Sequence, residues 1–286
     1  MPNTEKGILY IVATPIGNLA DFSFRAAEIL QNADVIAAED TRRSRPLLDR
    51  YGITKPMVAL HEHNEEATTS RLLERLANGE SVALISDAGT PLINDPGFPL
   101  VRRARERGIR VTPIPGPCAL IAALSASGLP CDRFAFEGFP PRTASARRVQ
   151  LEKLVADPRT LIFYESSHRM LEFIKAIAEV FPAQRQVVIA RELTKLYETI
   201  VQVPVGQAPA LIEADANMCK GEFVIIVQGA SGTKPLDELT PEQARVLKLL
   251  LEKCSVTTAA TLAAKITGAR KGIVYRAALR LAEKCP

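Results

Sequence analysis

The sequence predicts an α/β fold with two sheet-containing lobes followed by a small helical domain. Three observations predict it. Short apolar runs alternate regularly with helical patterns over residues 1–128. A second set of apolar runs, which does not alternate regularly with helical patterns, fills residues 129–229, and helical patterns alone fill residues 240–286. Buried parallel strands are nearly continuous in apolar residues, and their alternation with helices indicates a parallel sheet. We therefore expect a mostly parallel sheet in the first lobe and a mixed sheet in the second.

The first lobe contains four predicted strands and four predicted helices. The strands are Ile8–Ala13, Val35–Ala38, Val82–Ile85 and Val111–Ile114, and the helices cover residues 23–31, 42–50, 65–78 and 98–107. This alternation predicts an open sheet with helices on both faces.

The second lobe follows a helix that Gly116-Pro117 opens and that runs through Ser127. This helix carries small or apolar residues on every face, which predicts that it is buried. The strands expected after it are Phe134–Phe136, Thr160–Tyr164, Gln186–Ala190, Thr199–Val203 and Phe223–Val227, with a helix over 167–181. Only residues 191–198 separate two of these strands, and so short a connection favours antiparallel pairing.

The C-terminal segment follows a Gly- and Ser-containing linker, Gly229–Pro235. A capping box, Thr240-Pro241-Glu242-Gln243, opens its first helix. A second helix over about 256–266 ends at Gly268 and a third starts near 270, a pattern typical of a helix-turn-helix unit. Residues 240–286 hold nine Lys or Arg and three acids. This charge of +6 favours an anionic partner, although a solvated helix surface has the same composition.

The composition is that of a globular, cytoplasmic protein. The chain has 286 residues, 47% of them hydrophobic, with a polar N-terminus and no apolar run long enough to cross a membrane. Its five cysteines are scattered without a C-x-x-C pair, which predicts reduced thiols. His61 and His63 share one face of a strand end, but the sequence places no third ligand beside them, so no metal site is predicted.

Two loops rich in small residues follow predicted strands: Ala13–Leu19 and Ser86–Gly97. Ligands of open α/β sheets bind at the carboxyl ends of strands, where both loops would lie. Neither loop matches the dinucleotide fingerprint or the P-loop. The alternative is a pair of ordinary turns, but two Gly and two Pro in the second loop favour a ligand loop.

These loops are two of nine motifs, in ordered succession along the chain, that together resemble the tetrapyrrole-methylase superfamily. The others are Ala38–Arg42, His61–Glu65, Pro115–Ala119, Phe139–Arg142, Tyr164–Arg169, Ala190–Lys195 and Gly221–Phe223. The resemblance runs from Gly7 to Gly229 and is closest to the superfamily's ribosomal branch, whose extra C-terminal domain the helical tail matches. It implies 2′-O-methylation of a cytidine in the decoding centre of 16S ribosomal RNA, on naked RNA or on the small subunit. It also implies a homodimer and S-adenosylmethionine bound between the lobes.

The resemblance also implies which residues touch the methyl donor. They come from three loops of the first lobe and from two strands of the second: Thr14, Pro15, Ile16, Gly89, Thr90, Ile93, Cys118, Ala119, Tyr164, Glu222 and Phe223. Small-residue loops suit this ligand because its adenine needs apolar walls and backbone hydrogen bonds.

Candidates for assisting the acceptor hydroxyl are the charged residues of cleft-facing loops. They are Glu39, Asp40, Glu192 and Lys195. Lys195 acts as a base if desolvation lowers its pKa, or else it holds a phosphate. An alternative role is structural, with Glu39, Arg42, Arg191 and Glu192 forming an ion-pair network between the lobes.

Two basic surfaces are candidates for RNA binding. Arg142, Arg147 and Arg148 belong to the loop expected after Phe134–Phe136, whereas Arg276, Arg280 and Lys284 recur every four residues along the last helix. Few aromatic residues lie among them, which favours phosphate contact over base stacking.

Three other functions compete with this interpretation. A small-molecule methyltransferase acting on a porphyrinoid would share the two-lobed core but would need neither the basic tail nor the arginine loop. A non-catalytic RNA-binding protein would not need the Gly–Pro loops. A nucleotide-dependent oxidoreductase would carry a dinucleotide fingerprint.

Overall fold

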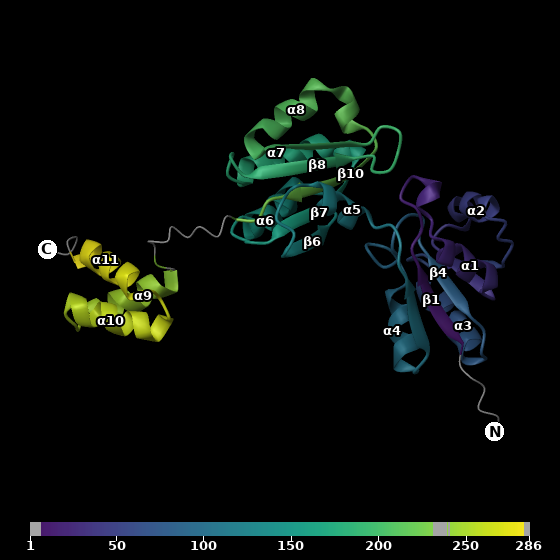
Figure 1. The fold of residues 1–286 in the computed structure, drawn as a ribbon, viewed down its shortest axis with the longest axis horizontal. Coiled ribbons are helices and arrows are strands. Elements are labelled where there is room, and N and C mark those ends of the chain that lie inside the picture. The colour runs from purple at the N-terminus through teal and green to yellow at the C-terminus, as the bar shows by residue number, and fades with distance from the viewer. Residues whose placement is uncertain (1–6, 231–238, 240, 283–286) are drawn as a thin grey trace. The chain divides into compact units, whose positions relative to one another are not determined.

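The computed structural model describes residues 7–230, 239 and 241–282, and these form two compact units. The first unit ends at Gly229 and contains two sheets, and the second begins at Ala230 and contains helices (Figure 1).

The first sheet is parallel throughout and has the strand order β3-β2-β4-β1-β5. Its strands are β1 (Ile8–Val12), β2 (Val35–Ala38), β3 (Met57–Ala59), β4 (Val82–Ile85) and β5 (Arg110–Ile114). This confirms the parallel sheet expected for the first lobe. β3 was not predicted from the sequence, because three residues are too few to show a periodicity.

Helices cover both faces of this sheet, as expected. They are α1 (Phe24–Asn32), α2 (Thr41–Arg50), α3 (Glu65–Ala77) and α4 (Phe98–Glu106). Leu30 of α1 and Leu48 of α2 pack with Ile36 of β2 on one face, and Leu72 of α3 and Leu100 of α4 pack with neighbouring strand residues on the other. The ribbon shows α1 and α2 on one side of β1 and β4, and α4 on the other (Figure 1).

The second sheet is mixed and has the strand order β6-β7-β10-β8-β9. Its strands are β6 (Phe134–Gly138), β7 (Thr160–Ser166), β8 (Gln186–Arg191), β9 (Thr199–Pro204) and β10 (Glu222–Val227). β6 and β7 pair in parallel, and the remaining pairs are antiparallel. The antiparallel pairing of β8 and β9 confirms the expectation drawn from their short connection.

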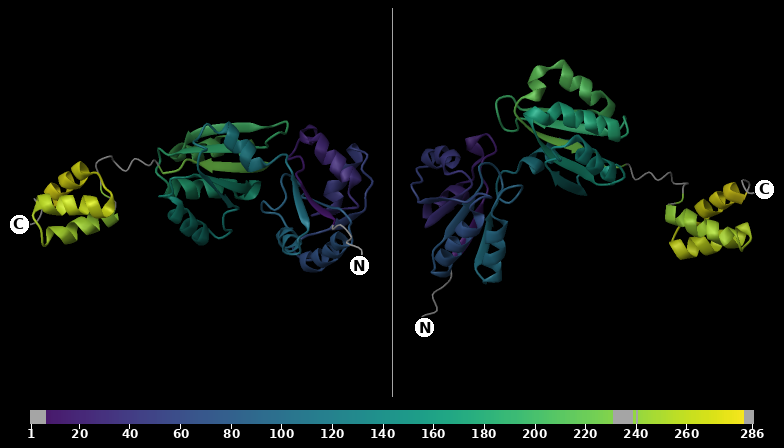
Figure 2. Two further views of the ribbon diagram at one scale, coloured as in Figure 1. Left: turned by 60° about the horizontal axis from the view of Figure 1, so that its bottom comes forward. Right: turned by 180° about the vertical axis from the view of Figure 1, so that it is seen from behind.

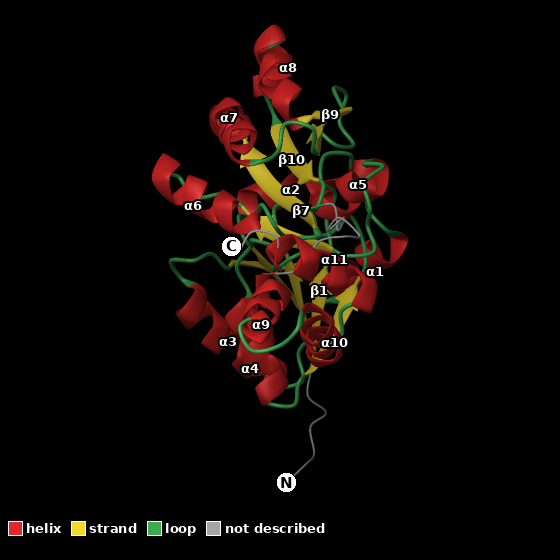
Figure 3. Cartoon of the chain, turned by 90° about the vertical axis from the view of Figure 1, so that its left-hand side faces the viewer, coloured by secondary structure: helices red, strands yellow, loops and turns green. Residues whose placement is uncertain are grey.

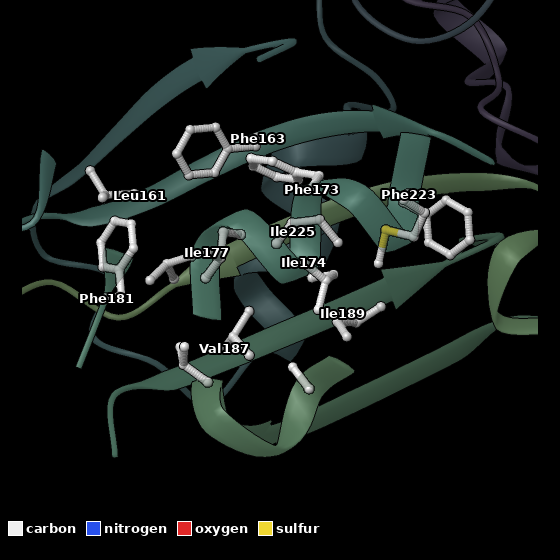
Figure 4. Packing of buried hydrophobic residues seen from close by; sticks show 14 of the residues in the cluster. Leu161, Phe163, Phe173, Ile174, Ile177, Phe181, Val187, Ile189, Phe223 and Ile225 are labelled. Atoms are coloured by element: carbon white, nitrogen blue, oxygen red, sulfur yellow. The ribbon is translucent and has the colours of Figure 1, made fainter. Parts of the chain in front are cut away.

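Helices cover both faces of the second sheet as well. α5 (Ala119–Ala126) packs on one face, and α6 (Ala144–Leu154), α7 (Met170–Val180) and α8 (Ala208–Ala214) lie on the other (Figure 3). Phe163 of β7 and Phe173 of α7 meet edge to face, with ring centroids 5.3 Å apart, at the centre of a fully buried cluster (Figure 4). Short 3-10 turns cover Leu19–Asp21, Ser167–Arg169, Val205–Gln207 and Ala216–Cys219.

The structure differs from the sequence-based expectation in three helices. α5 begins at Ala119 with Cys118 as its N-cap, so Gly116-Pro117 precedes the helix and does not open it. α6 and α8 were not predicted. Residues 144–154 show no apolar stripe, because the buried face of α6 carries Arg147 beside Leu151.

The second unit consists of α9 (Pro241–Leu251), α10 (Val256–Thr267) and α11 (Lys271–Ala282) (Figure 2). Ala259, Ala260 and Ala263 of α10 pack with Leu247 of α9 and Val274 of α11. Gly268 has a φ of +70° and ends α10, as its position after the helical pattern predicts. Of the helices formed by the described residues, none combines the length and apolar composition that crossing a bilayer requires.

Gly97 cannot be replaced without strain, because it has a φ of +118° and a Cβ there would lie 2.7 Å from Leu84 Cδ2. We expect Gly97→Ala to lower the free energy of unfolding by about 3 kcal/mol, the sum of a left-handed backbone penalty and overpacking. Gly52→Ala is the control: its φ is +65° but no atom lies within 4 Å. It should cost only about 1–2 kcal/mol. Urea unfolding followed by circular dichroism measures both, and equal losses would contradict the overpacking.

Candidate functional site

A cavity of about 400 Å³ lies in the first unit, where loops of the first sheet meet strand ends of the second. A volume of this size suits a small organic ligand. The lining residues come from the loops after β1, β2 and β4, from the start of α5 and from β7, β8 and β10 with their flanking residues: Ile16, Glu39, Arg43, Asp87, Ala88, Gly89, Thr90, Ile93, Asn94, Asp95, Cys118, Ala119, Phe139, Tyr164, Glu165, Ser166, Ala190, Leu193, Glu222, Phe223 and Val224.

The cavity gathers nine of the eleven residues that the sequence suggested for the methyl donor. These are Ile16, Gly89, Thr90, Ile93, Cys118, Ala119, Tyr164, Glu222 and Phe223. The other two, Thr14 and Pro15, are buried beside it. Residues far apart in the chain, such as Ile16 and Phe223, therefore line the same cavity.

Thr14 contributes to the frame of the site. Its backbone forms an antiparallel bridge with Gly89, with N–O distances of 2.8 and 3.1 Å, and its hydroxyl donates to the carbonyl of Ser86 at 3.2 Å. Thr90 Oγ1 donates to the carbonyl of Pro117 at 3.0 Å and joins the same loop to the segment before α5. Since Gly89 has a φ of +85°, glycine is the residue that this loop conformation favours.

One side of the cavity is acidic. Glu39, Asp87 and Asp95 line it, and the cation beside them is Arg43, whose Nη1 lies 3.1 Å from Asp87 Oδ2. Burial, followed by the charge of Glu39, raises the pKa of Asp95 to about 6. Burial and the charge of Asp87 also raise the pKa of Glu39. The site therefore gathers carboxylates whose charge a cationic ligand would neutralise.

The raised pKa of Asp95 makes stability depend on pH. Asp95 ionises near pH 6 in the folded protein and near the usual 3.8 in the unfolded chain, so its stabilising contribution is complete below pH 3.8 and is lost as the pH rises through 6. We expect Asp95→Asn to stabilise the ligand-free protein at pH 7.5 by about 1 kcal/mol, since solvent screens a half-buried group, and to stabilise it less at pH 4.5. Chemical unfolding at the two pH values measures this. Asp49→Asn, at an exposed position of α2, is the control. If it stabilises the protein as much as Asp95→Asn does, the gain comes from the change in net charge and not from the burial of Asp95.

Lys195, which does not itself line the cavity, joins two carboxylates. Its Nζ lies 2.9 Å from Glu192 Oε1 and 3.0 Å from Glu222 Oε2, and Glu222 lines the cavity. Burial opposes the charge of Lys195, but the hydrogen bonds to Glu192 and Glu222 outweigh it and raise its pKa. Burial likewise opposes ionisation of Glu192, but the hydrogen bonds from Lys195 and the Glu222 amide lower its pKa. The condition for Lys195 to act as a base is therefore not met: it is a cation at neutral pH.

The structure does not form the inter-lobe ion-pair network that the sequence allowed. Asp40 caps α2, accepting from the amide of Arg42 at 2.9 Å, and pairs with the side chain of Arg42 at 3.2 Å. Arg191 Nε donates to the carbonyl of Lys220 at 2.7 Å and Nη1 to that of Tyr197 at 3.2 Å. Each of these groups is satisfied within its own lobe. Of the two candidates after β2, only Glu39 lines the cavity.

Arg147 was predicted to contact RNA, and the structure contradicts this. Its side chain is 5% exposed on the inner face of α6, with Nη2 3.4 Å from Glu172. Arg142 and Arg148 are exposed, although Arg148 lies on α6 and pairs with Glu152 at 2.9 Å. On α11, Arg276 is exposed and Arg280 lies within the helix, whereas Lys284 is outside the described residues.

Several lining residues were not singled out from the sequence, notably Arg43, Asp87, Asp95, Phe139 and Glu165. Asp87 and Asp95 lie in the loop Ser86–Gly97. Their position after the carboxyl end of a strand is the sequence feature that identifies them as candidates. The rings of His61 and His63 are 6.0 Å apart. Across the part of the chain that the structure describes, no three His, Cys, Asp or Glu side chains group as metal ligands would.

Two family models match the chain. The model of the tetrapyrrole (corrin/porphyrin) methylases matches residues 8–209, and that of the RsmI C-terminal HTH domain matches residues 237–282. The first match covers the first sheet and every strand of the second sheet except β10, and the second match covers the helices of the second unit.

Known proteins match over nearly the whole chain. Proteins named ribosomal RNA small subunit methyltransferase I are 52% identical in Escherichia coli, over 97% of this chain and 96% of the relative, and 54% identical in Xylella fastidiosa, over 95% and 99%. Among solved structures, uroporphyrin-III C-methyltransferase from Thermus thermophilus complexed with S-adenyl homocysteine has a TM-score of 0.53 at 18% identity, over 77% of this chain and 97% of that one. With its two sheets, its shared cavity and these matches, the chain is a methyltransferase and belongs to the tetrapyrrole methylase family.

Proposed function

We propose that this protein uses S-adenosylmethionine to methylate the 2′-hydroxyl of a cytidine in the decoding centre of 16S ribosomal RNA. The observation that carries the proposal is that the similarity to small-subunit RNA methyltransferases continues through the basic second unit. A small macrocyclic substrate gives no reason for such a unit, whereas a polyanion does.

The lining of the cavity fits the methyl donor. S-adenosylmethionine combines an adenine, which needs apolar walls, with a positive sulfonium and an ammonium group. Ile16, Ile93 and Phe223 supply apolar surface, and Glu39, Asp87 and Asp95 supply negative charge. A burial-raised carboxylate pKa falls again when a cation binds nearby, so the acidic side favours a cationic ligand.

The chemistry needs an aligned acceptor more than it needs a strong base. When bound, the donor would supply an electrophilic methyl group for the ribose oxygen, with its thioether as the leaving group and the hydroxyl proton passing to water. Positioning of this kind is worth about 7–11 kcal/mol. The fixed loops Thr14–Ile16 and Ser86–Gly97 are suited to this task, because the Thr14–Gly89 bridge ties them together.

We assign Glu192 and Lys195 to the acceptor side of the site. Glu192, with its lowered pKa, is ionised at neutral pH and provides a hydrogen-bond acceptor. Lys195 provides a fixed positive charge that orients Glu192 and Glu222. Both residues follow β8, and Glu192 has a φ of +50°, a backbone conformation that is uncommon outside glycine and often found at functional sites.

RNA contact is assigned to Arg142 and Arg148 of the first unit and to Arg276, Arg280 and Lys284 of the second. A protein that acts on ribosomal RNA works in the cytoplasm, and by family resemblance it works as a homodimer. Sedimentation analysis tests the homodimer directly.

The proposal is tested by deleting this one gene and mapping 2′-O-methylation along the 16S ribosomal RNA. We expect one cytidine of the decoding centre to lose its methyl group and to regain it when the gene is restored on a plasmid. If every 2′-O-methylated site keeps its modification in the deletion strain, the proposal is wrong.

A further inference from the structure

Phe139 stands at the cavity as an aromatic ring that is half open to solvent. It lines the cavity, directly follows β6 and is 53% exposed. Its ring meets that of Tyr164 edge to face, with centroids 5.8 Å apart. Phe223, which lines the same cavity, is only 3% exposed. Because Phe139 also lines the cavity, its exposed ring is available for contact with a ligand that the chain itself does not supply.

The segment that carries Phe139 is held by Arg169, which is partly exposed and pairs with the buried Glu165. Arg169 Nη2 donates to the carbonyls of Pro140 at 2.6 Å and Pro141 at 3.1 Å, and it lies 3.2 Å from Glu165 Oε2. The side chain of Glu165 is fully buried, and its Oε1 accepts from the amide of Ser166 at 2.8 Å. Arg169 therefore connects the end of β7 to the two residues after Phe139.

Keeping Glu165 buried has an energetic cost. Burial raises the pKa of Glu165 even though the positive charge of Arg169 lowers it. The cost of desolvating the carboxylate therefore offsets part of the stability that the ion pair provides. Arg169, which donates to two consecutive carbonyls, is well placed to hold the backbone that follows Phe139 in one position. A ring fixed in this way loses little entropy when a partner stacks on it.

We propose that Phe139 is the stacking platform for the base of the acceptor nucleotide, and that Glu165 and Arg169 are the positioning residues that hold it. The proposal rests on the proposed function, because it names a subsite for the RNA substrate. Arg142, exposed three residues after Phe139, is placed to contact a phosphate of the same strand. Single-stranded RNA is commonly bound by this combination of an aromatic face and a cation.

The first test replaces the ring and measures two affinities. Labelled S-adenosylmethionine and small subunits from the deletion strain give kcat and KM for RNA, and calorimetry with S-adenosylhomocysteine gives donor affinity. We expect Phe139→Ala to lower kcat/KM for the subunits by roughly 10- to 100-fold, the range of base–aromatic stacking, with unchanged donor affinity. Phe139→Trp should restore most of the activity. Phe24→Ala, at a 96% exposed phenylalanine of α1, is the matched control and should have no effect.

The second test asks whether Arg169 acts through Phe139. Arg169→Gln should raise KM for the subunits and so lower kcat/KM, as Phe139→Ala does, and Glu165→Gln should have a weaker effect of the same sign. Arg169→Lys should recover part of the loss, because the lysine ammonium can still donate a hydrogen bond to a carbonyl. In a double-mutant cycle, Arg169→Gln should add little to Phe139→Ala, since both remove the same platform. A merely structural role for Arg169 would instead lower donor affinity and add to the effect of Phe139→Ala.

The outcomes separate this proposal from the proposed function. If the parent protein methylates no RNA, the proposed function is wrong and the subsite falls with it. If the parent methylates subunits but Phe139→Ala does so equally well, or loses donor affinity in proportion to activity, only the platform is wrong. In the second of these cases Phe139 belongs to the donor wall.

Discussion

Gly89→Val should weaken binding of S-adenosylhomocysteine by about 100-fold, because a small displacement in a preorganised site has effects of this size. Gly89 has a φ of +85°, where a β-branched residue is strained. A Cβ at this position would lie 3.3 Å from Ile16 Cγ2, a residue of the cavity wall. The substitution therefore displaces the bridge to Thr14 and narrows the cavity. Isothermal calorimetry on the purified variant measures the loss.

The control separates the effect on binding from general backbone strain. Gly52→Val makes the same change at a φ of +65°, in a loop where no atom lies within 4 Å of the new Cβ. It should destabilise the fold by a similar backbone penalty and leave donor affinity unchanged. If Gly89→Val binds S-adenosylhomocysteine as tightly as the parent protein, the cavity is not the donor site.

Lys195→Ala should lower kcat for methyl transfer by about 100-fold, the size of effect that follows the loss of one fixed electrostatic contact from a preorganised site, with little change in donor affinity. Removing Lys195 leaves Glu192, whose side chain is 18% exposed, beside Glu222 without its cation. Lys195→Arg should restore activity only in part, because Gly17 packs against the lysine stem and a guanidinium does not present one point charge to two carboxylates.

The pH profile distinguishes a fixed cation from a base. Because the pKa of Lys195 is raised, we expect this residue to stay protonated. The kcat of the parent protein should therefore show no alkaline rise that is absent from Lys195→Ala. A rise of that kind, lost in the variant, would show that Lys195 gives up its proton. Full turnover by Lys195→Ala would show that it has no part in the reaction.

The sequence predicted the sheets well where burial alone decides the pattern. β2 and β4 begin and end at the residues expected, because strands covered on both faces are uniformly apolar. Helix α6 was missed for the opposite reason. Its inner face holds Arg147, and only the packing of α6 against α7 shows that this arginine is buried and paired with Glu172.

The site was predictable in its loops and not in its charges. The loops Ala13–Leu19 and Ser86–Gly97 were found because strand ends and small residues are visible in a sequence. The state of Lys195 was not, since it depends on Glu222, which lies 27 residues away and arrives through the pairing of β8 with β10. Asp95 likewise meets Glu39 only after folding, and their mutual repulsion is a property of the cavity.

The most direct test of the account is methyl transfer by the purified protein to small ribosomal subunits from the deletion strain. We expect label from S-adenosylmethionine to enter 16S ribosomal RNA at one cytidine 2′-hydroxyl, to stop at one methyl group per subunit, and to be absent when parent-strain subunits are supplied. The account is contradicted if the subunits take up no label while a tetrapyrrole does.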